Sequence, residues 1–149
     1  MKSNILYLLF MAFGVLMVSC SKDDKDTTKP QILIEEPAMN QIFYPGDEIH
    51  FGAEFIDNVE LRSYKIDIHV NEDGHDHKST RGEGEWSFQK SWEFEAGKKN
   101  AGIHHDEIVI PAEVDGVPIH TGDYHFLVYC TDKAGNESWV AVNIEIQNR

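Results

Sequence analysis

The feature that most constrains the fold of this chain is the regular alternation of apolar and polar residues along short segments. In residues 48–57, which follow the turn sequence Pro45-Gly46-Asp47, every second side chain is apolar, and residues 61–70 continue the pattern. A period of two is typical of a strand with one buried and one exposed face. The pattern therefore predicts strands over a common core, with these side chains inward: Ile49, Phe51, Ala53, Phe55, Tyr64, Ile66, Ile68 and Val70.

Similar segments recur along the rest of the chain. The expected strands are residues 31–35, 48–57, 61–70, 86–94, 104–110, 122–132 and 137–147. A polar, glycine-containing loop is expected over residues 71–85, and a tight turn over residues 133–136. Beyond the N-terminal segment, no window of ten or more residues has helical periodicity. Seven short strands in about 120 residues favour an all-β, antiparallel β-sandwich.

Two segments near the C-terminus resemble parts of immunoglobulin-like (Ig-like) domains. Residues 122–128 look like the penultimate strand of such domains, in which a tyrosine, here Tyr124, locks a corner. Residues 132–136 are similar to the hairpin that closes many bacterial Ig-like modules. The resemblance implies a seven-stranded antiparallel sandwich of the Ig-like or fibronectin-like type.

The N-terminus has the pattern of a secreted lipoprotein. Lys2 precedes a mostly apolar run over residues 5–18, which is shorter than the roughly 20 residues that a membrane-spanning helix needs. Residues 16–20, Leu-Met-Val-Ser-Cys, resemble a lipobox. That resemblance implies cleavage before Cys20 and acylation of Cys20, which anchors the protein to the outer membrane of the cell envelope.

The residues after Cys20 extend this resemblance. Residues 21–26 are similar to the acidic tract of Bacteroidetes lipoproteins that are exported to the cell surface; the alternative is a solvated acidic linker. The whole chain resembles short Bacteroidetes surface lipoproteins with a single Ig-like domain of unknown function. The expected organisation is a signal peptide over residues 1–19, a lipidated cysteine and linker over residues 20–30, and one sandwich domain over residues 31–149.

Charge and cysteine content restrict the partners and the source of stability. Cleavage of residues 1–19 removes Lys2 and no acid, leaving 12 basic and 26 acidic residues, a net charge of −14. Such a surface repels nucleic acid, so nucleic-acid binding is not expected. With Cys20 acylated, Cys130 is the only thiol, and no intramolecular disulfide forms.

Histidines are the first candidates for a binding site. If the strand 61–70 pairs with the strand 122–132 from Leu61 and Asp132 onward, His69 and His125 lie close together on the outer face. The following loop adds His75 and His77. These four residues are the predicted ligands of zinc or another divalent transition metal, since neutral imidazoles suit such ions.

Four other histidines have lower priority as ligands. His120 and His50 are candidate additional ligands, whereas His104 and His105 are expected at the opposite end of the domain. The alternative for the whole set is that histidines in polar loops and on outer sheet faces are simply solvated. Asp57, Asn58 and Asp132 are expected to cluster at the other end, where turn chemistry explains them better than calcium binding does.

A pair of aromatic residues gives the second candidate site. If Thr131 pairs with Glu137, Tyr129 faces Trp139 on the outer side of the sheet. An exposed pair of this kind is a platform for a glycan or a protein partner. The alternative is that residues 71–85 cover it. Because the chain has no nucleophile motif, no HExxH sequence and no phosphate-binding glycine loop, a binding protein is expected rather than an enzyme.

Overall fold

The computed structural model of this protein describes residues 25–71 and 84–149, and every regular element in them is a β-strand. The strands are β1 (Gln31–Glu36), β2 (Gln41–Phe43), β3 (Glu48–Ile56), β4 (Leu61–Val70), β5 (Phe88–Glu93), β6 (Asn100–Val109), β7 (Glu113–Val114), β8 (Val117–Pro118), β9 (Gly122–Asp132) and β10 (Glu137–Ile146). A helix long and apolar enough to cross a bilayer is not found in this part of the chain.

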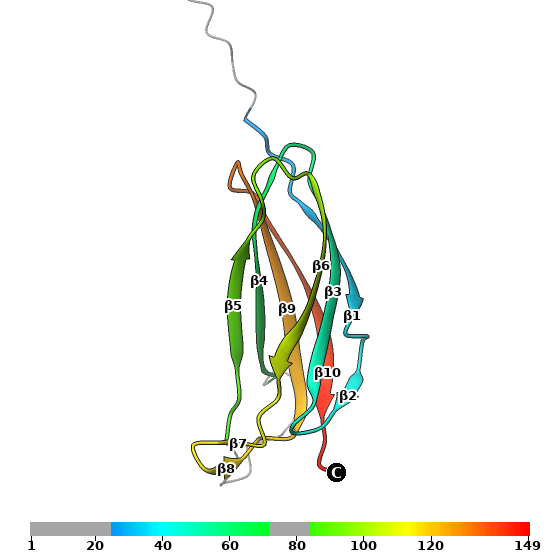
Figure 1. Ribbon diagram of the computed structural model, residues 1–149, viewed down its shortest axis with the longest axis vertical. Helices are drawn as coiled ribbons and strands as arrows, with labels where there is room; N and C mark the ends of the chain where they lie inside the picture. The colour runs from blue at the N-terminus through cyan, green and yellow to red at the C-terminus, as the bar shows by residue number, and fades with distance from the viewer. Residues whose placement is uncertain (1–24, 72–83) are drawn as a thin grey trace, which may run out of the picture.

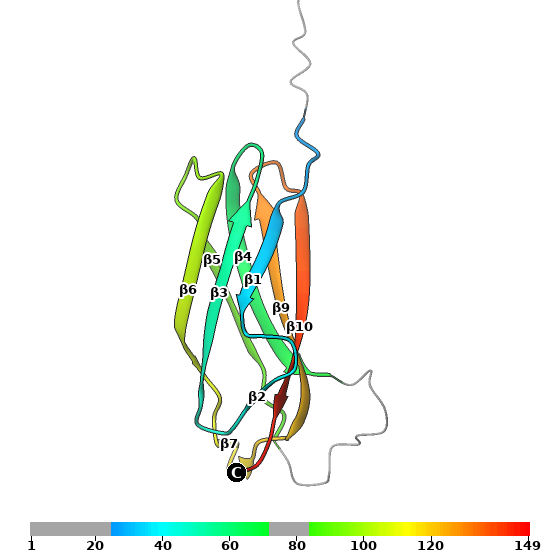
Figure 2. The ribbon, with the colours of Figure 1, turned by 90° about the vertical axis from the view of Figure 1, so that its right-hand side faces the viewer.

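The strands form two facing sheets and one small hairpin. One sheet has the order β1-β3-β6, and the other has the order β2-β10-β9-β4-β5. Figure 2 shows the three-stranded sheet in front of the five-stranded one, and Figure 1 shows the two layers from the side. The hairpin of β7 and β8 lies at the end of the molecule away from the N-terminal segment (Figure 1). The architecture is thus an all-β sandwich.

The core lies between the sheets and has the predicted alternation. In β3, Ile49, Phe51, Ala53 and Phe55 are all buried, as the period of two predicted. In β4, the residues Tyr64, Ile66 and Ile68 are buried, and Val70 is partly buried against the same core. The rings of Phe51 and Phe126 stack across the two sheets, with their centroids 5.8 Å apart. The sheets therefore pack through the faces that the sequence pattern made apolar.

Each of the seven segments predicted to be strands contains one, but the structure adds three short strands. β2, β7 and β8 have only two or three residues each, too few for an alternating pattern to be visible in the sequence. β2 pairs in parallel with β10, so the five-stranded sheet is not wholly antiparallel. β6 starts at Asn100 rather than at residue 104, because residues 100–103 pair with the end of β3.

The pairing of β4 with β9 positions the first candidate site. Leu61 pairs with Asp132 as expected, but the register then shifts by one residue between Leu61 and Ser63. Because of this irregularity His69 lies opposite His125; unbroken pairing from Leu61 would have placed it opposite Tyr124. A one-residue shift also decides which face each side chain occupies. The irregularity at the start of β4 therefore determines which residue of β9 lies beside His69 at the other end of the strand.

Tyr124 fixes the entry to β9. Its hydroxyl donates a 2.8 Å hydrogen bond to the backbone carbonyl of His120, four residues earlier, and its side chain is fully buried. The bond satisfies two polar groups in an apolar region, where an unpaired group is costly. This is the corner contact that the sequence around Tyr124 indicated.

We expect Tyr124→Phe to lower the free energy of unfolding by about 1–3 kcal/mol, because it leaves the buried His120 carbonyl without its tyrosine donor. Urea unfolding monitored by tryptophan fluorescence measures the change. Tyr129→Phe, which removes a hydroxyl from the outer face of the same strand, is the matched control and should change stability by less than about 0.5 kcal/mol. Equal stability of the two variants would contradict the corner's contribution.

Candidate functional site

His69 and His125 form a pair on the outer face of the five-stranded sheet. They are direct cross-strand partners, and their rings meet edge to face with centroids 5.6 Å apart. His69 Nδ1 lies 3.0 Å from a carboxylate oxygen of Asp67, to which it donates a hydrogen bond. This bond leaves His69 Nε2 as the nitrogen available to a ligand. The predicted closeness of the two histidines is confirmed.

Asp67 is held as a carboxylate beside His69. Burial by itself raises the pKa of Asp67, but the hydrogen bond from His69 and a 2.8 Å bond from the Gln89 amide outweigh burial and leave the pKa below its ordinary value. Lys65 adds an ion pair at 3.6 Å. The carboxylate is therefore ionised at neutral pH and orients the imidazole.

Within the described residues, none of the other predicted metal ligands lies beside this pair. His75 and His77 lie outside the part of the chain that the structure describes. His120 is buried below the surface near Tyr124, with 6.4 Å between the ring centroids. His50 lies on the outer side of the other sheet, where its Nδ1 donates to Asp106 at 2.8 Å, and this bond raises the pKa of His50. Its proposed addition to the same metal site is wrong, because the sandwich separates the two outer faces.

A metal site needs at least one more ligand than this pair offers. Within residues 25–71 and 84–149, no three ligand atoms that include a histidine nitrogen lie within 4.8 Å of one another. Zinc generally takes three or four protein ligands. The histidine pair is thus half of the predicted ligand set, with the remaining half in the segment outside the described residues.

His104 and His105 lie in the middle of β6 rather than at the end of the domain where they were expected. They pair with Gly52 and Phe51, respectively. The His105 ring faces inward and stacks on Trp92 at a centroid distance of 4.3 Å. The placement differs from the prediction because β6 begins four residues earlier than the sequence pattern indicated.

His105 joins a hydrogen-bonded chain that the sequence did not reveal. Its Nε2 lies 2.8 Å from the Tyr64 hydroxyl, and its Nδ1 lies 3.2 Å from a carboxylate oxygen of Glu107. A proton on Nδ1 lets the imidazole donate to Glu107 and accept from Tyr64. Burial and the negative charge of Glu107 raise the pKa of Tyr64 to about 12. Because Trp92 stacks on the imidazole, this chain forms part of the packing between β4, β5 and β6.

Tyr129 and Trp139 form the second candidate site. They are direct partners between β9 and β10, as predicted, and the Trp139 side chain is 61% exposed. The ammonium group of Lys65 lies 4.1 Å from the centre of the Tyr129 ring. A pocket beside the pair is lined by Ser63, Tyr64, Lys65, Ser91, Tyr129, Thr131 and Glu137. The pair therefore combines an exposed aromatic surface with nearby hydroxyl, ammonium and carboxylate groups.

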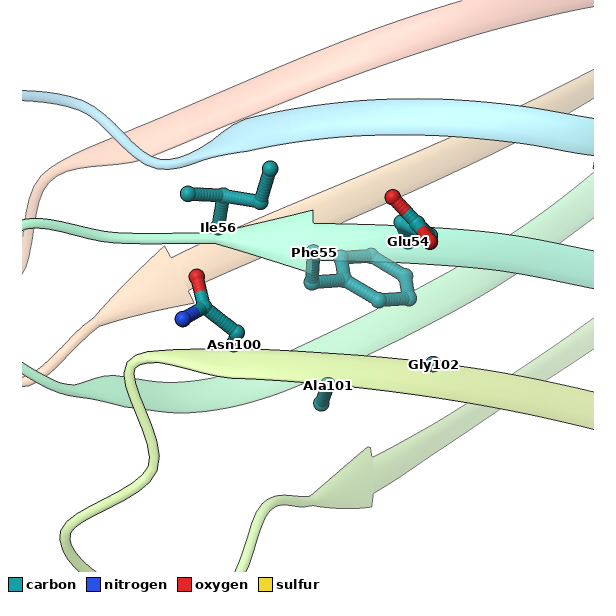
Figure 3. A pocket seen from close by; sticks show the side chains of 6 residues that line it. All are labelled: Glu54, Phe55, Ile56, Asn100, Ala101 and Gly102. Carbon is teal, nitrogen blue, oxygen red and sulfur yellow. The ribbon is translucent and has the colours of Figure 1, made fainter.

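A different pocket lies on the three-stranded sheet where β3 ends and β6 begins (Figure 3). It is lined by Glu54, Phe55, Ile56, Asn100, Ala101 and Gly102. Ile56 and Asn100 project from one side of the ribbons, while Phe55 and Ala101 project from the other. Glu54 is its single ionisable lining residue, so this pocket lacks a cluster of convergent chemical groups.

Asp57 and Asp132 make the turn contacts that were expected of them. The Oδ1 atom of Asp57 accepts hydrogen bonds from the backbone amides of Val59 and Glu60 at 2.9 and 2.7 Å. Asp132 Oδ1 accepts the Asn136 amide at 2.7 Å. These bonds order the turns between β3 and β4 and between β9 and β10.

Cys130 lies in the core below those turns. Burial is the main cause that raises the pKa of its thiol to about 12, and the negative charges of Asp57 and Asp132 add to the effect. The thiol is therefore protonated throughout the physiological pH range. This fits the expectation of an inert buried cysteine.

The structure is a β-sandwich domain whose five-stranded sheet has aromatic residues and histidines on its outer face. A comparison with protein families is consistent with a single domain. A family model described as "Domain of unknown function (DUF4625)" matches residues 18–147, so the chain belongs to that family. The curated proteins include no match.

Among solved structures, one similar chain is the sporulation control protein Spo0M from Bacillus subtilis. The sequences are 13% identical, and the TM-score is 0.40. The match covers 81% of this chain and 49% of the other, so this chain spans about half the length of that protein.

We expect Cys130 to resist thiol reagents in the folded protein at pH 8, because a pKa of about 12 leaves only about one thiol in ten thousand as the reactive thiolate. Cys20→Ser makes Cys130 the only cysteine. Reaction with Ellman's reagent should be negligible in buffer and stoichiometric in guanidinium chloride. Rapid reaction of the folded protein at pH 8 would show that the thiol is accessible.

Proposed function

We propose that this protein is a lipid-anchored binding module of the cell envelope, with an Ig-like sandwich that presents the outer face of its five-stranded sheet to a glycan. The support for the anchor is the lipobox-like sequence that ends at Cys20. The support for the Ig-like type is the Tyr124 corner together with the two-sheet arrangement. The absence of nucleophile motifs favours binding rather than catalysis.

The observation that carries the proposal is the exposure of Trp139 beside Tyr129. A tryptophan that leaves 61% of its surface in water forgoes most of the free energy that its burial would contribute. Its neighbour in the sheet offers a second ring, so the two rings present a larger apolar surface than either one alone. Sugar rings bind such surfaces through their C–H faces, and binding hot spots are rich in Trp and Tyr.

Polar groups around the rings suit a neutral glycan. Lys65, Ser91 and Glu137 line the adjoining pocket and offer donors and acceptors for sugar hydroxyls. The strong net negative charge of the chain disfavours anionic polymers. A protein partner that buries Trp139 is the alternative within the same site.

The position of the N-terminal segment supports an outward-facing site. Residues 25–30 enter β1 at the end of the sandwich that also carries the β9–β10 turn (Figure 1). His69 and His125 lie toward the other end of β4 and β9. A tether at Cys20 would therefore hold the histidine end away from the membrane, with the sheet face free along its side.

Metal capture is a second candidate function, and the His69–His125 contact favours it. Asp67 fixes one imidazole, and the segment after β4 carries His75 and His77. Two histidines from the sheet and two from this segment would give four imidazoles, which suits zinc, copper or nickel. The same surface could then serve in sensing a divalent ion.

We expect Trp139→Ala to weaken glycan binding by about 30-fold, the loss of one hot spot of about 2 kcal/mol. A panel of neutral polysaccharides, screened by affinity electrophoresis with the full-length protein in mild detergent, identifies the ligand, and calorimetry measures its Kd. Val109→Ala, which shortens an exposed side chain on the other sheet, is the control. Undiminished binding by Trp139→Ala, or no polysaccharide bound at all, would contradict the glycan site.

For the metal site, calorimetric titration with Zn²⁺, Cu²⁺ and Ni²⁺ should show binding at pH 7 that weakens strongly at pH 5, because protonated imidazoles cannot bind a metal. His69→Ala and the double variant His75→Ala/His77→Ala should each lose most of the affinity. His50→Ala is the matched control, since His50 lies on the opposite outer face. Absence of heat with all three ions at pH 7 would remove this function.

A further inference from the structure

Three carboxylates from distant parts of the chain meet at the end of the sandwich where the N-terminal segment enters. Asp26 belongs to that segment, Asp57 follows β3, and Asp132 ends β9. One oxygen from each of the three lies within 4.8 Å of the others. Figure 1 shows the N-terminal segment beside the loops at this end.

Two of the three carboxylates are almost fully buried and the third, Asp26, is half-buried, and no cation in the described residues pairs with them. Asp57 is 6% exposed and Asp132 is 1% exposed. Among the ion pairs found in residues 25–71 and 84–149, none includes a carboxylate of the cluster. Lys133 binds Glu60 instead, and Lys99 binds a backbone carbonyl. Three neighbouring negative charges with so little solvent repel one another strongly.

Two oxygen atoms in the cluster have no hydrogen-bond donor in the part of the chain that the structure describes. Asp57 uses Oδ1 for the turn amides, and Asp26 uses Oδ1 for the Thr28 amide and the Asn58 side chain. The Oδ2 atoms of Asp26 and Asp57 are both buried and have no partner among the described residues. An unpaired buried carboxylate oxygen is costly, and the residue that carries one of them, Asp57, is more than nine-tenths buried. Local hydrogen bonds therefore account for one oxygen each of Asp26 and Asp57, whereas both oxygens of Asp132 accept from Asn136.

Oxygen ligands such as these carboxylates favour a hard cation, Ca²⁺ or Mg²⁺. The cluster contains carboxylate oxygens and no histidine nitrogen or cysteine sulfur. The backbone carbonyls of Asp26 and Thr28 lie close by, since both accept from the Asn136 side chain, at 3.1 and 3.3 Å. Ca²⁺ accepts six to eight such oxygens in irregular geometry, whereas Mg²⁺ requires a nearly ideal octahedron.

We propose that Asp26, Asp57 and Asp132 bind a Ca²⁺ ion that fastens the N-terminal segment to the sandwich. The ion would supply the positive charge that three carboxylates need and a partner for both free Oδ2 atoms. Two ligands come from the body of the sandwich and one from the N-terminal segment, so binding holds the segment in one direction relative to the sheets. The site is separate from the outer-face residues and does not depend on their function.

The test is a titration of the full-length protein in mild detergent, treated first with EDTA and then dialysed. Calorimetry with CaCl₂ at pH 7 should show one ion bound per chain, and 5 mM Ca²⁺ should raise the Tm. Asp57→Asn keeps an Oδ1 acceptor for the turn amides but removes a charge, and it should weaken Ca²⁺ binding at least tenfold. Glu48→Gln, an exposed carboxylate on β3 far from the cluster, is the charge-matched control and should bind as the unchanged protein does.

A second variant and a second readout test the role of the N-terminal segment. Asp26→Asn alters only that segment, so it should fold normally and also lose Ca²⁺ affinity. Endoproteinase Lys-C, which does not require calcium, should cut after Lys25 at least tenfold more slowly with 5 mM Ca²⁺ than with EDTA, and this protection should vanish in both cluster variants. Absence of binding up to 10 mM Ca²⁺, equal affinity for Mg²⁺, or unchanged affinity in Asp57→Asn would overturn the proposal.

Discussion

Burial of alternate side chains between two sheets is the interaction on which the whole structure depends. Phe51 and Phe55 from one sheet meet Phe126 and Tyr64 from the other, with ring centroids 5.8 and 5.1 Å apart. The only cysteine in the described residues is a free, buried thiol, so this packing and the strand ladders hold the domain together. A slip of one residue in any strand would move its apolar side chains into water, and the core therefore fixes the register.

The same register determines the outer face. Once alternate residues of β4, β9 and β10 are committed to the core, the residues between them must point outward together. This rule aligns Trp139 with Tyr129 and His69 with His125 on a single sheet surface. Candidate ligand-binding groups thus acquire their positions from side chains that never contact a ligand. Substitutions in the core would disturb the surface through register rather than through direct contact.

The alternation of apolar and polar residues was enough to predict the longer strands and the cross-strand residue pairs. It could not predict contacts between residues that are distant in the sequence and meet only in the folded chain. The strand positions and the Tyr129–Trp139 pair came from a period of two. The short strand β2 has too few residues to show any period. His105 lies opposite Phe51 because the register of the β3–β6 ladder shifts between Ile49 and Phe51, and no local sequence pattern reveals such a shift. The meeting of Asp26 with Asp57 joins residues far apart along the chain, and no local pattern reports such an approach.

The first part of the chain contributes strands to both sheets, and this affects how the domain responds to a pulling force. β1 lies antiparallel to β3 in one sheet, and a few residues later β2 joins β10 in the other. A pull on the N-terminal segment acts along the β1–β3 ladder, so its hydrogen bonds share the load instead of opening one by one. If β1 detaches, β2 still ties the chain to the second layer. Tension applied at the N-terminal end therefore meets the β1–β3 ladder first and the β2–β10 ladder second, and forced unfolding of such ladders is governed by the rate of unfolding rather than by equilibrium stability.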